Sequence, residues 1–244
     1  MRYKLTIEYD GTPFCGWQRQ QGQLTVQEVL EDALKTALRQ GVELTGSGRT
    51  DTGVHALGQV AHFDTDSAVD VYRLRESLNA LVRPNPVSVR EIEPVPDTFH
   101  ARFSAKQRAY IYRIQNTRFP PALKYNRVWW YVHPLDENKM QQAANLLIGK
   151  HDLSTFRAAG CQAKSPIKTI DEIEVRRLDE EVQVEIKARS FLYHQVRNIV
   201  GSLVYVGSGK WTLSDFESAF KACDRTRGGE TAPANGLYFM SVEY

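Results

Sequence analysis

Apolar and polar residues alternate strictly at the start of the chain. Polar or charged side chains separate apolar ones at every second position, at Tyr3, Leu5, Ile7 and Tyr9. A period of two is typical of a half-buried strand. After residue 25 the apolar period lengthens to that of a helix, and T-V-Q-E at 25–28 has the spacing of a capping box. This pattern predicts a helix over 26–39.

The same two periods predict the remaining elements. We expect further helices over 71–81, 136–148, 192–206 and 212–222, and strands over 60–63, 87–93, 109–116, 170–175, 182–188 and 237–243. Hairpins and alternating strands favour mainly antiparallel sheets over a doubly wound parallel sheet. The predicted fold class is therefore α+β, with two halves that cover 1–104 and 105–244.

Composition narrows the class of protein only slightly. Hydrophobic residues make up 42% of the 244 residues and charged residues 25%, which is an ordinary globular mixture. No apolar run has the length of a membrane span, and the N-terminus lacks the apolar stretch of a signal peptide. Three scattered cysteines favour neither a disulfide framework nor a zinc site. We expect a cytoplasmic protein without a membrane partner.

Charge is distributed unevenly although the net charge is only +2. Residues 98–135 contain no Asp or Glu, and their cations, which alternate with Phe, Tyr and Trp, are Arg102, Lys106, Arg108, Arg113, Arg118, Lys124 and Arg127. Cations neutralise phosphates and aromatic rings stack on bases, so this mixture suits an RNA surface. A solvated face combined with core aromatics explains the composition equally well.

A glycine-rich loop holds the most informative chemistry. Residues 46–56 read G-S-G-R-T-D-T-G-V-H-A, in which Arg49 and Asp51 lie two positions apart. This is neither a dinucleotide fingerprint nor a phosphate-binding P-loop, because the third glycine of the first and the G-K-[ST] ending of the second are missing. A tight turn capped by Asp51 would explain the glycines but not Arg49 or His55.

The triplet D-T-G at 51–53 also occurs in aspartic proteases. Those enzymes need two such carboxylates that share a proton, so a single copy would require a homodimer. A guanidinium two residues away would favour ionisation of both carboxylates, which opposes proton sharing. A dimeric protease is therefore a remote alternative.

The loop and several flanking motifs together resemble the tRNA pseudouridine synthase A family. The central motif is G-R-T-D-T-G-V-H-A at 48–56. The others are F-C-G-W-Q-R-Q at 14–20, T-V-Q at 25–27, H-A-R-F-S-A at 100–105, Y-I-Y at 110–112, G-K-H-D-L-S-T-F-R at 149–157, F-L-Y-H-Q-V-R-N-I-V-G at 191–201 and A-P-A-N-G-L at 232–237. Their common order over almost the whole chain makes the resemblance specific.

The resemblance implies a reaction and residues that perform it. The N-glycosidic bond of a uridine is broken, and the uracil turns while held and rejoins the ribose through carbon. Asp51 is the implied essential carboxylate, and it attacks either the uracil ring or the sugar. A buried carboxylate needs a partner cation to stay ionised, and Arg197 matches the family position that supplies it. Arg49 is the nearer alternative, but we assign it to the gap left by a flipped nucleotide or to its phosphate.

Further site residues follow from the same motifs. A uridine must leave its stem before it can react, and Tyr110 matches the tyrosine that stacks on the flipped uracil, although it could equally be a core residue of its strand. Leu237 is expected to form an apolar wall of the pocket. His55 and Arg102 lie in matching motifs and are expected substrate contacts, although a structural role suits His55 well.

The predicted function is that of a tRNA pseudouridine synthase acting on the anticodon stem-loop, at tRNA positions 38 to 40. The resemblance further implies two RRM-like or ferredoxin-like halves flanking a central active-site cleft, a homodimer that binds tRNA, and no metal or other cofactor. The main alternative is a non-catalytic RNA-binding or tRNA-folding module. The basic stretch suits both functions, whereas a carboxylate aimed at RNA suits only the enzyme.

Overall fold

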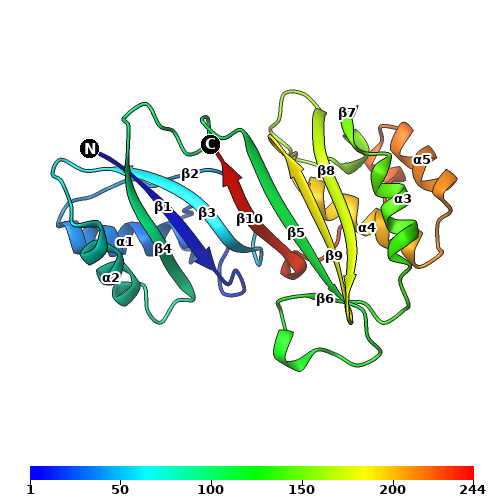
Figure 1. The fold of residues 1–244 in the computed structure, drawn as a ribbon, viewed down its shortest axis with the longest axis horizontal. Coiled ribbons are helices and arrows are strands. Elements are labelled where there is room, and N and C mark those ends of the chain that lie inside the picture. The colour runs from blue at the N-terminus through cyan, green and yellow to red at the C-terminus, as the bar shows by residue number, and fades with distance from the viewer. The chain divides into compact units, whose positions relative to one another are not determined.

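The computed structural model describes all residues from 1 to 244, and the chain forms two compact units. The first unit comprises Met1–Lys106 together with Tyr238–Tyr244, and the second comprises Gln107–Leu237. The last seven residues therefore belong with the first unit, whereas the predicted halves assigned them to the second. Figure 1 shows the chain entering and leaving through the same unit, since both termini are drawn there.

The first unit is built on a sheet with the strand order β4-β1-β3-β10. Its strands are β1 (Arg2–Tyr9), β3 (His55–Asp64), β4 (Val87–Val95) and β10 (Leu237–Glu243), with the short β2 (Thr45–Gly46) paired to β3. β1 runs antiparallel to both β3 and β4. β10 runs parallel to β3, with Tyr238 opposite His55.

Two helices cover one face of this sheet, α1 (Val26–Leu38) and α2 (Val71–Leu81) (Figure 1). The apolar period of two in β1 places Leu5 and Ile7, both fully buried, in the core. Thr25 caps α1 by accepting a hydrogen bond from the Glu28 amide. The predicted capping box is not complete in α1: the Glu28 side chain lies 3.7 Å from Arg19 Nη2 and does not bind the Thr25 backbone.

The second unit has a sheet with the strand order β5-β9-β8-β7. These strands are β5 (Gln107–Gln115), β7 (Gly149–Asp152), β8 (Ile167–Leu178) and β9 (Glu181–Ala188), and the short β6 (Trp129–Trp130) runs parallel to β5. The four main strands are antiparallel to their neighbours. The sheet therefore consists mainly of hairpin-type pairings.

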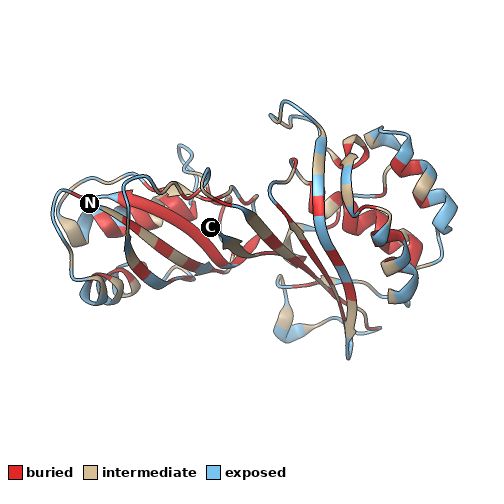
Figure 2. Cartoon of the chain, turned by 45° about the horizontal axis from the view of Figure 1, so that its top comes forward, coloured by how far each residue is buried: buried red, intermediate tan, exposed pale blue.

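Three helices belong to the second unit, α3 (Glu137–Asn145), α4 (Gln195–Gly207) and α5 (Leu213–Lys221). Figure 2 shows α4 almost entirely in the colour of buried residues, and eleven of its residues are buried. The predicted T-x-x-D start of α5 is a complete capping box between Thr212 and Asp215. Four single-turn 3-10 helices lie in the loops: η1 (Ala122–Lys124), η2 (Ser154–Phe156), η3 (Arg225–Arg227) and η4 (Ala234–Gly236).

The predicted α+β class with mostly antiparallel strands is confirmed. The helix over 71–81 and the strand over 237–243 have the predicted bounds. Several predicted bounds are wrong, among them the starts of β3 and α4 and both ends of β8 (Ile167–Leu178). β3 begins at His55 rather than at 60, and α4 begins at Gln195 rather than at 192, because His194 adopts a left-handed backbone with φ 57°. None of the helices has the length and apolarity needed to cross a membrane.

Candidate active site

The loop that carries Asp51 connects β2 to β3 in the first unit. Asp51 is half-buried, whereas Arg49 is exposed. The buried side chain of Gln59 holds the approach to the loop, because its Oε1 accepts a hydrogen bond of 2.7 Å from Ser47 Oγ and its Nε2 donates one of 3.0 Å to Gly48 O. The backbone immediately before Arg49 is thereby fixed to β3.

A second segment, residues 11–17, supports the loop from another side. The Trp17 amide donates a hydrogen bond of 3.0 Å to Thr50 O, and the Gly53 amide donates one of 3.4 Å to Phe14 O. Gly16 has φ 87°, and a Cβ added to it would lie 2.5 Å from Thr50 O. Only glycine combines this backbone angle with such a close approach. The peptide that leads into Asp51 therefore has little freedom to move.

Thr50, the residue before Asp51, is fixed through its side chain as well. Its hydroxyl and the Tyr9 hydroxyl share a buried hydrogen bond of 2.7 Å. Burial raises the pKa of Tyr9 well above its ordinary value, against the opposing effect of the bond to Thr50. The phenol therefore stays neutral, and its hydroxyl holds Thr50 at the end of β1.

His55 lies inside the protein, and its side chain makes protein contacts. It is 1% exposed, and its ring stacks on Tyr238 with centroids 4.6 Å apart. Nδ1 accepts a hydrogen bond of 2.9 Å from the Gly11 amide and lies 3.1 Å from Asp10 Oδ1. Because one nitrogen cannot accept and donate at once, the two contacts require different protonation states. We assign the neutral form that accepts from Gly11, since Asp10 Oδ1 already accepts two hydrogen bonds from Thr12.

The remaining predicted residue of the first unit, Arg102, does not lie on this loop. It is exposed in the turn that follows His100, and its guanidinium carbon lies 5.7 Å from the centre of the Phe103 ring. His100 Nδ1 accepts hydrogen bonds from the amides of Arg102 and Phe103 and so fixes this turn. The first unit therefore brings Arg49, Asp51 and His55 together on one segment and places Arg102 on another.

Arg197 lies in the first turn of α4 in the second unit. Its Nε donates a hydrogen bond of 2.7 Å to Ala232 O, and its Nη1 lies 3.2 Å from His194 Nε2. The Arg197 carbonyl in turn accepts from the Ala232 amide at 3.2 Å. The Arg197 side chain is half-buried, and its Nε is held by Ala232 O. The loop around Ala232 therefore sets the direction of the guanidinium.

That loop is held against α4 by a polar network that the sequence analysis missed. Asn198 Oδ1 accepts hydrogen bonds from Arg225 Nη2 at 3.1 Å and from Thr231 Oγ1 at 2.7 Å. A Cβ on Gly201 would overlap Glu230 O, so the loop lies directly on the helix backbone. The pair of glycines at 228–229 beside Arg225 is the sequence signal that could have indicated such a close approach.

The two tyrosines of the Y-I-Y motif have different environments. Tyr112 is fully buried and donates a hydrogen bond of 2.7 Å to Pro233 O. Burial raises its pKa well above the ordinary value. Tyr110 is only half-buried, and its ring lies perpendicular to that of Phe191 with centroids 5.0 Å apart. Of the two, Tyr110 is the more exposed.

Leu237 follows the 3-10 helix η4 and is 6% exposed. A Cβ on the preceding Gly236 would lie 2.6 Å from the Tyr112 ring, so this glycine allows the chain to pass over the tyrosine. The second unit thus joins its predicted site residues through shared neighbours: Tyr112 connects the strand of Tyr110 to the loop before Leu237, and Ala232 in that loop binds Arg197. No group of His, Cys, Asp or Glu side chains in the chain has a geometry that could hold a metal ion.

A family model described as tRNA pseudouridine synthase matches residues 5–104 and 143–244, which is most of the chain. The chain therefore belongs to the tRNA pseudouridine synthase family.

Curated relatives support the same assignment at high identity. The chain is 53% identical over 243 residues to tRNA pseudouridine synthase A of Xanthobacter autotrophicus, covering 100% of this chain and 99% of that protein. It is 50% identical over 244 residues to the protein of that name from Rhodospirillum rubrum, covering 100% and 88%. The similarity to the Afipia carboxidovorans protein of the same name is 51% over 243 residues, covering 100% and 99%.

Proposed function

We propose that the chain converts uridine to pseudouridine in tRNA with Asp51 as its catalytic carboxylate. The observation that carries this proposal is the support of the Asp51 backbone: the Trp17 amide binds the Thr50 carbonyl, Gly16 packs closely against that carbonyl, and Asp51 itself is half-buried. Catalysis by a carboxylate depends on its being held in a fixed geometry. A turn with a purely structural role would not require Arg49 to be exposed beside it.

The proposed reaction needs neither an oxidant nor water. The bond between N1 of uracil and C1′ of the ribose breaks, and a bond between C5 and C1′ forms. C5 loses its proton and N1 gains one, so substrate and product are isomers. Attack by Asp51 at C6 of the ring or at C1′ of the sugar requires an ionised carboxylate in both cases. Retention of the detached uracil requires a closed pocket.

Arg197 is proposed as the cation that keeps Asp51 ionised. The resemblance assigns Arg197 this role. Its contacts with Ala232 O and His194 Nε2 support a defined direction for the guanidinium. An opposite charge favours the ionised form of a carboxylate, which burial alone would disfavour. Burial raises the pKa of Tyr112, and the positive charge of Arg197 opposes that rise, so Arg197 acts electrostatically on this side of the second unit.

The target uridine must be extruded from the RNA, which costs about a few kcal/mol. We propose that the ring of Tyr110 stacks on the flipped uracil, since stacking on one base contributes ~1–3 kcal/mol. The exposed Arg49 is proposed to fill the vacated position or to bind its phosphate, and Leu237 to form an apolar wall. For His55 we propose a role in holding Gly11 and Tyr238, because its ring is buried between them.

We further propose the anticodon stem-loop as the site of modification. The test uses unmodified tRNA transcripts labelled with tritium at C5 of uridine, because isomerisation releases that hydrogen to water. One transcript carries uridine at positions 38 to 40, and a matched transcript carries base-paired cytidine there. Release from the first alone supports the proposal. Equal release from both would place the target uridine elsewhere, and binding without release from any transcript would favour an RNA-binding module.

A homodimer in the cytoplasm completes the proposal, as the resemblance implies. Sedimentation equilibrium of the purified chain tests the first part. A mass near twice 27.8 kDa is expected, and a monomer that remains fully active would contradict it.

A further inference from the structure

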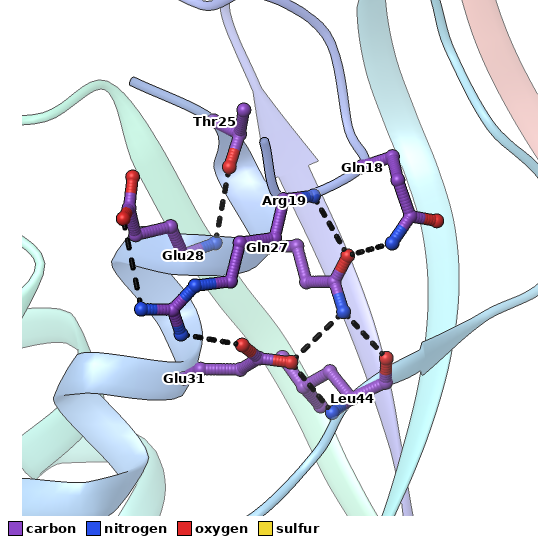
Figure 3. A network of polar contacts seen from close by, with 7 residues as sticks. All are labelled: Gln18, Arg19, Thr25, Gln27, Glu28, Glu31 and Leu44. Atoms are coloured by element: carbon purple, nitrogen blue, oxygen red, sulfur yellow. Dashed lines mark hydrogen bonds and ion pairs between the residues drawn. The ribbon is translucent and has the colours of Figure 1, made fainter. Parts of the chain in front are cut away.

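Gln27 is a buried polar side chain on α1 that is 5% exposed and forms four hydrogen bonds. Its Oε1 accepts from Gln18 Nε2 at 2.8 Å and from the Arg19 amide at 2.9 Å. Its Nε2 donates to Glu31 Oε1 at 2.8 Å and to Leu44 O at 3.0 Å. Figure 3 shows this amide at the centre of the network. All four bonding positions of the amide are therefore used.

Glu31 completes the same network on the other side of Gln27. It is 8% exposed; its Oε1 also accepts from the Leu44 amide at 3.0 Å, and its Oε2 accepts from Arg19 Nη1 at 3.0 Å (Figure 3). Both backbone groups of Leu44 are thus bound, one by Gln27 and the other by Glu31. Buried polar networks of this kind specify one arrangement when every group is satisfied.

Gln27 binds two segments near Asp51. One lies beside the Asp51 loop in space, and the other precedes that loop in the sequence. Residues 16–19 form the first segment: the side-chain Oε1 of Gln27 accepts from the Arg19 amide, and the Gln27 backbone amide donates to Trp17 O at 3.0 Å. The Trp17 amide in turn donates to Thr50 O at 3.0 Å. Leu44 lies at the start of the other, which runs through β2 into the Asp51 loop. A Cβ on Gly46 would lie 2.6 Å from Trp17 Nε1, so the two segments also touch each other.

We infer that Gln27 is a positioning residue for Asp51: its amide holds the segment behind the catalytic loop and the segment that leads into it in one fixed relation. The inference rests on the proposed role of Asp51. The Gln27 side chain forms no hydrogen bond with Asp51, and it is buried away from the surface where RNA would bind. Its loss should therefore lower the rate of the chemical step while leaving tRNA affinity unchanged. A misplacement of about 1 Å at a reacting group costs up to about 100-fold in rate.

The test compares Gln27→Ala with a matched control, Asn79→Ala. Asn79 lies on α2 and also clamps a backbone with its amide, since its Nδ2 donates to Val89 O at 2.9 Å and its Oδ1 accepts from the Val89 amide at 2.8 Å. Both variants lose side-chain hydrogen bonds to backbone groups, but only Gln27 is connected to the Asp51 loop. Gln27→Met, which keeps the side-chain volume, replaces Gln27→Ala if the latter does not fold.

Single-turnover release of tritium and tRNA affinity are measured for each variant below its own unfolding midpoint. We expect the Gln27 variants to lose between about tenfold and about 100-fold in rate, with Kd within about twofold, and Asn79→Ala to keep the wild-type rate. Hydrogen exchange should accelerate over 14–20 and 44–54 in the Gln27 variants, and over 79–92 in Asn79→Ala.

Three results would contradict the inference: a wild-type rate in a folded Gln27 variant, equal rate losses in the Gln27 and Asn79 variants, or a loss confined to affinity. Asp51→Asn is measured alongside them. If Asp51→Asn is inactive and Gln27→Ala is fully active, only the positioning role fails. If Asp51→Asn is fully active, the proposed function itself fails.

Discussion

The hydroxyl groups of Tyr9 and Thr50 lie 2.7 Å apart in the protein interior and join the end of β1 to the residue before Asp51. Thr50 O also accepts from the Trp17 amide. Side chain and backbone of the same residue are thus held by different elements. The Asp51 loop is consequently tied to the sheet through Thr50.

Tyr9→Phe removes one partner of this buried hydrogen bond. We expect the free energy of unfolding to fall by about 1–2 kcal/mol, because the Thr50 hydroxyl is left without its partner. Urea denaturation measures the change. The matched control is Tyr72→Phe, since Tyr72 is 65% exposed and should show no measurable loss. Equal stability of Tyr9→Phe and the wild type would show that the Tyr9 hydroxyl contributes nothing.

His62 should make stability sensitive to mild acid. Burial, followed by the nearby charges of Arg2 and His100, lowers its pKa to about 4, whereas an unfolded histidine titrates near pH ~6.5. Between these pH values the unfolded chain binds a proton that the folded chain does not, so stability falls as the pH is lowered from ~6.5 to ~4.

The expected size of this loss is about 2–3 kcal/mol. His62→Gln keeps an acceptor for the Ala101 amide, which donates to His62 Nδ1 at 3.2 Å, but does not titrate. Unfolding free energies are measured at pH 7, 5.5 and 4 for both proteins. The difference between them should change across this range; parallel pH profiles would show that His62 is not the responsible group.

Gly201→Ala should disturb the loop that anchors Arg197. The added methyl group would overlap Glu230 O, so the loop must lift from α4 and the bond from Arg197 Nε to Ala232 O must lengthen. Overpacking of this kind costs about 1–3 kcal/mol, and turnover should fall as well. Gly41→Ala, where nothing lies within 4 Å of the added Cβ, is the control. Unchanged turnover and stability in Gly201→Ala would contradict the close packing.

Tyr110→Ala should lower turnover by roughly 10- to 100-fold, because a stacked base loses ~1–3 kcal/mol. The affinity for tRNA should change far less, since the rest of the RNA still binds. Tyr110→Phe retains the ring and should keep most of the rate. Single-turnover rates and filter-binding affinities separate these effects. Equal losses of rate and affinity in Tyr110→Ala would argue against stacking on the flipped uracil.

Several features of the fold followed from periodicity alone. The helix over 71–81 and the strand over 237–243 have strong apolar periods and clear ends, and both have the predicted bounds. β3 was predicted too short because the buried polar residues His55 and Gln59 interrupt the apolar pattern before residue 60. Their burial depends on hydrogen bonds to other segments, which a local pattern does not contain.

The site was predictable in its chemistry but not in its support. The family motifs indicated Asp51, Arg197 and Tyr110 as site residues. Their catalytic and substrate-binding roles stay predictions. Two supporting features have no local sequence signal, because each joins residues far apart in the chain. They are the close approach of Gly16 to Thr50 and the parallel pairing of β10 with β3. The capping box predicted at 25–28 was wrong for the same reason, because the Glu28 carboxylate pairs with Arg19.

Asp51→Asn is the decisive variant for the proposed role of Asp51 as the catalytic carboxylate. The variant keeps the size of the side chain and removes its charge. Tritium release from an unmodified tRNA transcript is measured in EDTA, together with tRNA affinity. We expect no detectable release and an affinity close to that of the wild type. Full release by Asp51→Asn would show that Asp51 is not the catalytic carboxylate.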